Sequence, residues 1–135
     1  MSINKEAFEI WVEALESGEF SKTTGVLHDE YGYCCLGVAC VKAIENGVEL
    51  YVEGEREDGW SYDGEGGSLP PKVMDWLGVD ECDPMLRINL GNPDFPEVEE
   101  AHASDVNDNF GYDFPRIAAA IRRTYLEEHA SSTES

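Results

Sequence analysis

Three cysteines lie close together in the run YCCLGVAC, residues 33–40, and thiols this close could bind zinc, attack an electrophile or pair as a disulfide. Zinc sites usually place their cysteines two to four residues apart and repeat that pair elsewhere in the chain. Here Cys34 and Cys35 are adjacent, Cys40 follows later, and the fourth cysteine, Cys82, is distant. The spacing therefore predicts no metal site, and no other pattern calls for a cofactor.

A catalytic thiol is the second interpretation of the same run. Cys34 and Cys35 stand at the start of a predicted helix, where the helix dipole lowers a thiol pKa, and His28 is a candidate base. A net charge of −20 works against a thiolate, however, because the thiolate is itself an anion. Catalysis by Cys34 or Cys35 with His28 is therefore the alternative hypothesis. Cys40 lies on the apolar face of the helix and is interpreted as a small core residue.

The run DVNDNFGYDF, which starts at Asp105, partly resembles a calcium-binding EF-hand loop. Asp105, Asn107 and Asn109 take the first, third and fifth places, but Phe110 replaces the essential glycine and Arg116 the final glutamate. We interpret the segment as a turn in which Asn107 and Asp108 bind backbone groups.

Charge restricts the function more than any motif does. The chain has 29 acidic and 9 basic residues, so direct binding to nucleic acid or to an anionic membrane is disfavoured. No stretch approaches the roughly 20 apolar residues of a membrane span, and the start MSINKEAFEIW lacks the features of a signal peptide. We expect a cytoplasmic protein with reduced thiols.

The clearest charged feature is a row of glutamates along the first predicted helix, Glu6, Glu9, Glu13 and Glu16. Like charges at this spacing cost about 0.2–0.5 kcal/mol per pair. The row either imitates the phosphates of a polyanion such as DNA or reflects a generally acidic proteome. Because it faces away from the apolar stripe, we expect lysine at Glu9, Glu13 and Glu16 to leave folding stability level or slightly raised. Trp60 and Tyr62, in an otherwise polar segment, are the other candidate binding residues.

Four helices and one hairpin are predicted to position these residues. The first helix runs from its cap Asn4 to Gly18, the second covers 34–46, the third begins after its cap Ser68 and ends at Gly78, and the last runs from its cap Asp113 to about residue 128. Hairpin strands are expected near 48–53 and 59–63, and mostly irregular structure over 79–104. The residues expected to face inward are Phe8, Trp11, Val12, Leu15, Leu36, Cys40, Ala43, Ile44, Val73, Trp76, Leu77, Ile117, Ile121 and Tyr125.

These elements define the predicted fold class, a helix-rich α+β single domain over 1–129 with a small antiparallel β-hairpin. Residues 130–135, rich in serine, are expected to form a disordered tail.

Three runs resemble, in order, a family of small uncharacterised proteins encoded by tailed bacteriophages and prophages. They are WVEALESGEFSKTTGVLHDEYGYCCLGVAC, LPPKVMDWLGV and NDNFGYDFPRIAAAIRR, and they span most of the chain. The chain departs from the family pattern at Ser21 and Lys22, where a glutamine is usual, and in its acidic middle segment.

The resemblance implies a phage accessory protein acting in the host cytoplasm, and it brings no known activity or catalytic residues. Together with the charge, it favours a non-enzymatic protein-binding module. Its expected partner is a protein of the host or the phage, such as a basic nucleic-acid-binding host protein that a polyanion mimic would block. Besides the thiol-dependent enzyme, a structural or virion-associated protein is the remaining alternative.

Overall fold

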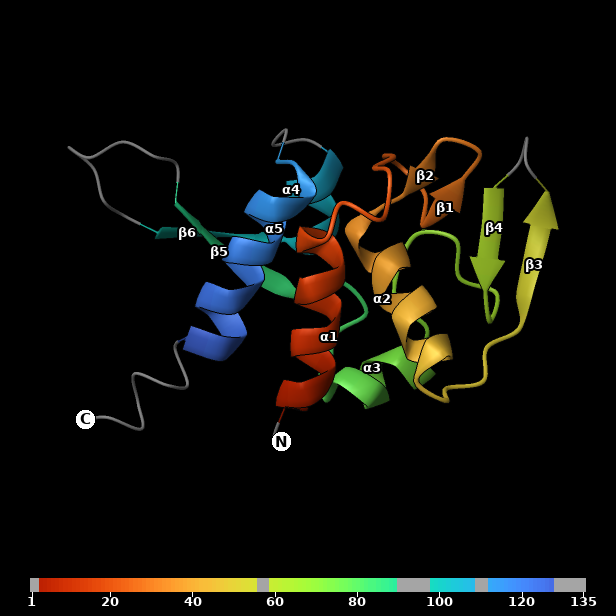
Figure 1. Cartoon of the computed structure of the whole chain (residues 1–135), viewed down its shortest axis with the longest axis horizontal. Coiled ribbons are helices and arrows are strands. Elements are labelled where there is room, and N and C mark those ends of the chain that lie inside the picture. The colour runs from red at the N-terminus through yellow and green to blue at the C-terminus, as the bar shows by residue number, and fades with distance from the viewer. Residues whose placement is uncertain (1–2, 56–58, 90–97, 109–111, 128–135) are drawn as a thin grey trace.

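Helix α1 (Lys5–Glu16) lies at the centre of the molecule, between the C-terminal helices and helix α2 (Cys35–Glu45), as Figure 1 shows. The computed structural model describes residues 3–55, 59–89, 98–108 and 112–127. Asn4 caps α1 as predicted, because its side-chain oxygen accepts a hydrogen bond of 3.2 Å from the backbone N–H of Ala7. The predicted stripe is confirmed as core, since Phe8, Trp11, Val12 and Leu15 are all buried.

Helix α2 packs unusually close to the segment that precedes it. A Cβ atom on Gly37 would lie 2.0 Å from the carbonyl oxygen of Leu27, so only glycine fits there. The prediction that Ile44 faces inward is wrong, because its side chain is 38% exposed. The buried arc of α2 is centred nearer Cys35 and Ala39, which leaves Ile44 at its margin in the last turn.

A four-stranded antiparallel sheet covers the end of the molecule beyond α2, with the strand order β2-β1-β4-β3. The predicted hairpin is present as β3 (Val52–Glu55) and β4 (Gly59–Tyr62), although its first strand begins later than expected. Two short strands, β1 (His28–Asp29) and β2 (Gly32–Tyr33), extend it. Each has two residues, too few for an alternating pattern to reveal them.

A second sheet contradicts the expectation of irregular structure over 79–104. Strands β5 (Met85–Asn89) and β6 (Val98–His102) pair antiparallel. Leu86 and Ile88 are fully buried, which is the alternation expected of a strand with one face on the core. Pro93 and Pro96 lie between the strands in the chain, so the prolines bound the hairpin and do not prevent it.

The described ranges contain three further helices and a π-helix: α3 (Pro71–Leu77), α4 (Ala103–Asp108), α5 (Phe114–Ile121) and the π-helix η1 (Arg122–Glu127). Gly78 ends α3 with a left-handed conformation, as predicted, but its cap is Pro70 and not Ser68, whose hydroxyl donates to Glu65 instead. Asp113 caps α5 as predicted. Trp76 and Tyr125 are only partly buried. The other residues of these helices that were expected in the core are fully buried.

The structure shows α+β architecture with antiparallel sheets, so the predicted fold class is confirmed. The expected tail, 130–135, lies outside the described residues. Among the helices of the described ranges, none is long and apolar enough to cross a membrane.

Candidate functional site: an aromatic row beside an open strand edge

The thiols of the YCCLGVAC run are buried in the core. Cys35 and Cys40 are fully buried and Cys34 is 4% exposed. Burial raises the pKa of Cys34 to about 11 and raises that of Cys35 well above its usual range. These groups stay protonated at neutral pH, so the geometry favours packing over nucleophilic attack. All four cysteines are free thiols, and of these only Cys82 is exposed.

His28, the candidate base for these thiols, is engaged elsewhere. Its Nδ1 shares a hydrogen bond of 2.9 Å with the hydroxyl of Tyr62. Its ring lies between Tyr33, with a centroid distance of 3.9 Å, and Trp60, at 4.2 Å. Desolvation lowers the pKa of His28, so the imidazole is neutral near pH 7. Nowhere in the described ranges do three His, Cys, Asp or Glu side chains gather as a metal site.

The rings around His28 form the main candidate site, which we call the aromatic row: Phe20, Tyr33, His28 and Trp60. Phe20 meets Tyr33 edge-on at 5.2 Å, and the stacked pairs continue the row through His28 to Trp60. All four residues are partly exposed. The ammonium group of Lys42 lies 5.5 Å from the centre of the Phe20 ring, so one end of the row already binds a cation.

The register of the sheet explains why these rings meet. His28 is the cross-strand partner of both Tyr33 and Trp60. Paired residues in antiparallel strands point to the same face, so three rings of the row stack side by side on one face of the sheet. Tyr62 follows Trp60 by two residues and shares this face, but it is buried and serves the row through its hydrogen bond to His28.

The row ends at a vacant position. The cross-strand partner of Trp60 on its other side is Gly54, which has no side chain. A Cβ atom there would lie 2.2 Å from the carbonyl oxygen of Gly59, and Gly54 has a φ of +145°, so the position requires glycine. Among the residues that the structure describes, the indole of Trp60 is therefore flanked by His28 on one side, and the position paired with it in β3 carries no side chain.

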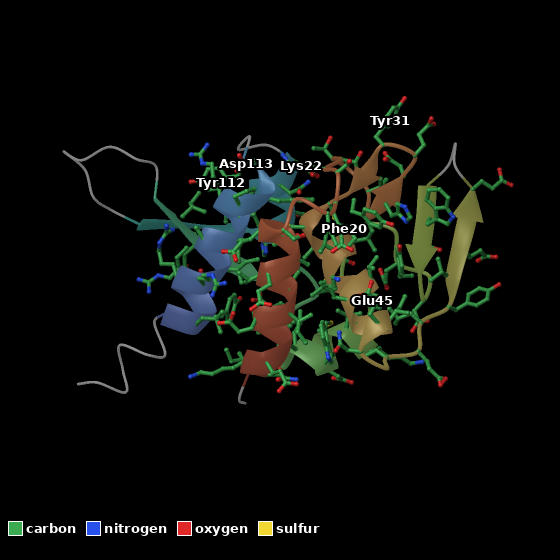
Figure 2. The ribbon with its side chains drawn as sticks, viewed as in Figure 1. Phe20, Lys22, Tyr31, Glu45, Tyr112 and Asp113 are labelled. Atoms are coloured by element: carbon green, nitrogen blue, oxygen red, sulfur yellow. The ribbon has the colours of Figure 1, made fainter. Side chains whose placement is uncertain are left out.

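Strand β3 is the last strand of the sheet, and all four of its residues are exposed. It lies at the outer end of the molecule in Figure 1. Tyr31 projects outward from the turn between β1 and β2, toward the other edge of the sheet (Figure 2). At the β3 edge, the neighbouring Tyr51 is 66% exposed and Val52 is 43% exposed. Large exposed apolar groups near one sheet edge are typical of a surface that binds another molecule.

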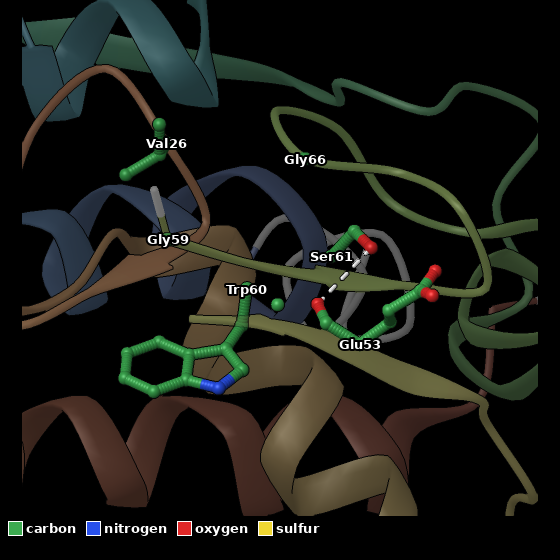
Figure 3. A pocket seen from close by; sticks show the side chains of 7 residues that line it. Val26, Glu53, Gly59, Trp60, Ser61 and Gly66 are labelled. Carbon is green, nitrogen blue, oxygen red and sulfur yellow. Dashed lines mark hydrogen bonds between the residues drawn. The ribbon is translucent and has the colours of Figure 1, made fainter. Parts of the chain in front are cut away.

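An open pocket of about 300 Å³ adjoins the row and the edge. It is lined by Val26, Glu53, Gly54, Gly59, Trp60, Ser61 and Gly66. Figure 3 shows the indole of Trp60 and the hydroxyl of Ser61 on opposite sides of β4, with that hydroxyl donating to the carbonyl oxygen of Glu53 at 3.3 Å. Glu53 contributes the acidic side chain of the pocket, and the glycines expose backbone.

The glutamate row of α1 is only partly available to a partner. The guanidinium of Arg122 contacts both Glu9, at 3.2 Å, and Glu16, at 3.0 Å. Glu6 and Glu13 are exposed to solvent. The hydrogen bond from Arg122 lowers the pKa of Glu16. The expectation that lysine at Glu9 and Glu16 leaves stability level therefore loses its basis, since it assumed that these carboxylates only repel one another.

Sequence reasoning singled out Trp60 and Tyr62 but not Phe20 or Tyr33, and it assigned His28 a different task. These residues come from three separate segments of the chain, and the pairing of β1 with β2 and with β4 brings His28, Tyr33 and Trp60 together. The sequence feature that could have revealed Phe20 and Tyr33 is the concentration of aromatic residues between positions 20 and 33.

Fold and site together define a small α+β protein with a partly exposed aromatic row next to an open acidic sheet edge. Its residues 3–125 match the family described as Domain of unknown function (DUF8296), and the chain belongs to that family. Comparison with curated proteins and with solved structures found no match.

Proposed function

We propose that the chain is a non-enzymatic protein-binding module that acts on a basic partner protein, with the aromatic row and strand β3 as its binding surface. The observation that carries this proposal is the stack of rings from Tyr33 through His28 to Trp60, partly exposed and ending beside the vacant position at Gly54. Aromatic side chains on rigid strands are the residues that dominate binding energy in protein interfaces.

The expected sign of the partner's charge follows from the surroundings of the row. Glu53 and Glu55 lie on the open strand, and both are exposed. The whole chain carries −20, which attracts a cationic protein over distance and speeds its encounter. Lys42 over the Phe20 ring is an internal example of the contact that a partner's lysine or arginine would make with Trp60.

Polyanion mimicry by α1 remains part of the proposal in a narrower form. Arg122 engages Glu9 and Glu16, which leaves Glu6 and Glu13 as the acids of that row that Arg122 does not contact. Two separated charges resemble a phosphate run less than four do, so the aromatic row is the better supported surface.

The biological setting that we propose is that of a phage accessory protein in the host cytoplasm, with a host or phage protein as its partner. Its support is the sequence resemblance carried by the cysteine-containing run and by the two later runs.

The test is capture of proteins from bacterial lysate on immobilised chain, followed by direct binding of each purified candidate to the chain. We expect the wild type to bind a basic protein, and we expect that complex to weaken steeply with salt. Trp60→Ala should abolish the binding. The matched control is the double variant Glu6→Lys, Glu13→Lys, which changes the exposed charges of α1 and leaves the sheet intact.

Loss of binding in the Trp60 variant with retention in the α1 variant would place the partner on the sheet. The reverse result would assign it to α1 and overturn the aromatic row as the surface. Failure of the wild type to bind any basic protein would overturn the proposed function itself.

A further inference from the structure

We propose that strand β3 binds an extended segment of the basic partner as a fifth strand of the sheet, with an arginine of that segment stacked on Trp60. This inference rests on the proposed function and specifies how the partner is bound. The occupant is a strand with an arginine opposite Gly54 and a lysine on each side of it. Three features of the structure lead to this assignment: the backbone of β3, the vacancy beside Trp60, and the carboxylates of the strand.

The backbone of β3 is available on its outer side. The N–H of Asp63 donates to the carbonyl oxygen of Tyr51 at 2.7 Å, which identifies Tyr51 and Asp63 as a hydrogen-bonded pair. In antiparallel sheets such pairs alternate with pairs whose backbone groups point away from each other. Continuing the register, Val52 and Gly54 direct their N–H and C=O groups away from β4 and toward the open edge.

The other sheet of the molecule shows how this protein covers an edge. The backbone N–H of Arg87, in β5, donates to the hydroxyl of Thr124 at 2.8 Å, and its carbonyl accepts from Arg123 at 2.7 Å. The hydroxyl of Tyr125 donates to the carbonyl of Met85, also in β5, at 2.9 Å. Side chains of η1 thus satisfy the edge of β5, as proteins commonly do. Strand β3 is left with four exposed residues and hydrophobic neighbours.

The vacancy at Gly54 selects the central residue of the incoming strand. A residue opposite Gly54 points to the face that carries Trp60, because cross-strand partners share a face. With no side chain at Gly54, a long side chain can pass over β3 and reach the side of the indole that faces β3. Arginine fits this position best, because its planar guanidinium stacks on aromatic rings and its stem covers the glycine.

The carboxylates select the residues on either side. Glu53 and Glu55 alternate with Gly54 along β3 and so point to the opposite face. The two residues that flank the arginine point to that same face, directly across from these carboxylates. Lysine there forms favourable cross-strand pairs, whereas an acidic residue is repelled. The predicted core of the bound segment is therefore Lys-Arg-Lys, set between β-branched residues that favour an extended conformation.

The probe for this inference is a fluorescein-labelled peptide, Thr-Val-Lys-Arg-Lys-Val-Thr, titrated with the full chain and followed by fluorescence anisotropy. Replacing its arginine by norleucine keeps the length of the stem and removes the cation, and should weaken binding on the order of tenfold. Trp60→Ala in the protein should give a similar loss with the original peptide. It should give no further loss with the norleucine peptide, since both changes remove one contact.

Two N-methylated peptides separate strand addition from simple charge attraction. One carries N-methyl groups on the arginine and both valines, and the other on the two lysines. An added strand directs only one of these two sets of amides toward β3, so one peptide should lose binding and the other should keep it. Equal binding of both methylated peptides and the parent would overturn strand addition.

The protein offers a matched pair of edge variants. Val52→Pro removes the N–H that points outward and leaves the hydrogen bonds between β3 and β4 in place, because proline is tolerated on that side of an edge strand. It should weaken the parent peptide at least tenfold, whereas Val52→Thr should bind as the wild type does. Circular dichroism reports whether each variant is folded. The methylated peptides test strand addition on the wild-type protein, where folding is not in question.

The two levels of the proposal fail differently. If the chain binds the lysine–arginine peptide but is indifferent to methylation and to Val52→Pro, strand addition is wrong and the basic-partner function stands. If the chain binds neither this peptide nor any basic protein, the proposed function fails with it.

Discussion

The side-chain oxygen of Asn107 accepts a hydrogen bond of 3.1 Å from the backbone N–H of Cys35, the first residue of α2. The amide nitrogen of Asn107 donates to the carbonyl oxygen of Thr23 at 2.9 Å. Cys34, at the N-cap position of α2, makes no side-chain capping hydrogen bond. A fully buried side chain from α4 therefore caps α2 from 72 residues away and ties both to the segment before the sheet.

Asn107→Ala should lower the free energy of unfolding by about 2–4 kcal/mol. The change leaves the N–H of Cys35 and the carbonyl of Thr23 buried without this partner, and each such group costs about 1–3 kcal/mol. Chemical denaturation measures the loss. Asn46→Ala is the control, since its side chain also bonds a helix carbonyl, that of Lys42, but is exposed to solvent. Equal effects of the two substitutions would contradict the capping role.

The native protein should show one rapidly reacting thiol with Ellman's reagent and four after unfolding. Cys82 is exposed, whereas the three thiols of the YCCLGVAC run are buried and protonated. Cys82→Ser should abolish the fast reaction. A second fast thiol would show that Cys34 or Cys35 reaches solvent and would revive the thiol-dependent enzyme.

Cys40→Ser should destabilise the fold by about 1–3 kcal/mol, because it places a hydroxyl in a fully buried site. Thermal unfolding followed by circular dichroism is the measurement. Cys82→Ser, at an exposed position, should leave the unfolding temperature unchanged.

Arg122→Gln should cost about 1 kcal/mol of stability and lose its effect in high salt. Arg122 contacts Glu9 and Glu16, and partly exposed ion pairs contribute about 0.2–1 kcal/mol each. Lys5→Gln removes the same charge from an exposed site and is the control. A salt-independent loss would indicate that Arg122 acts through packing and not through charge.

His28 should make the protein less stable as the solution becomes acidic. Its pKa is lowered in the folded state, so the unfolded chain takes up the proton first, and stability falls as the pH drops below about 6.5. The measurement is the unfolding temperature as a function of pH between 5 and 8. With His28→Gln, the fall in unfolding temperature caused by protonation of His28 should be absent.

His102 provides the opposite case within the same chain. Its pKa is raised, chiefly by a hydrogen bond to the backbone carbonyl of Asp83. Its contribution is present at low pH and disappears as the pH rises through the folded-state pKa. His102→Gln should therefore lower stability at pH 5 more than at pH 8. Identical pH profiles for the two histidine variants would contradict both assignments.

The predictable part of the fold is the part encoded by local patterns. The apolar stripe of α1, its Asn4 cap and the Asp113 cap of α5 depend on residues three or four positions apart, and each appears as expected. The hairpin of β3 and β4 was visible for the same reason, through its alternation and its glycines. Strands β5 and β6 were missed because the prolines between them were interpreted as marks of a long loop.

The candidate site was less predictable because its residues meet through long-range pairing. Trp60 stood out as a large ring in a polar segment, but its contact with His28 depends on the pairing of β1 with β4. The ion pairs of Arg122 with α1 likewise depend on how the last helices pack against the first. The capping role of Asn107 joins residues far apart in the chain, so the sequence suggested only a local turn.

The carboxylates of β3 also affect whether the protein associates with itself. An open edge strand is a template for pairing with an identical strand of a second copy, which is a common beginning of aggregation. In such a pair the carboxylates of Glu53 and Glu55 would be brought close to those of the other copy, in chains that each carry −20. Like charges therefore discourage homodimers at this edge, while a strand of opposite charge is admitted. A single strand thus combines availability to a partner with protection against its own copies.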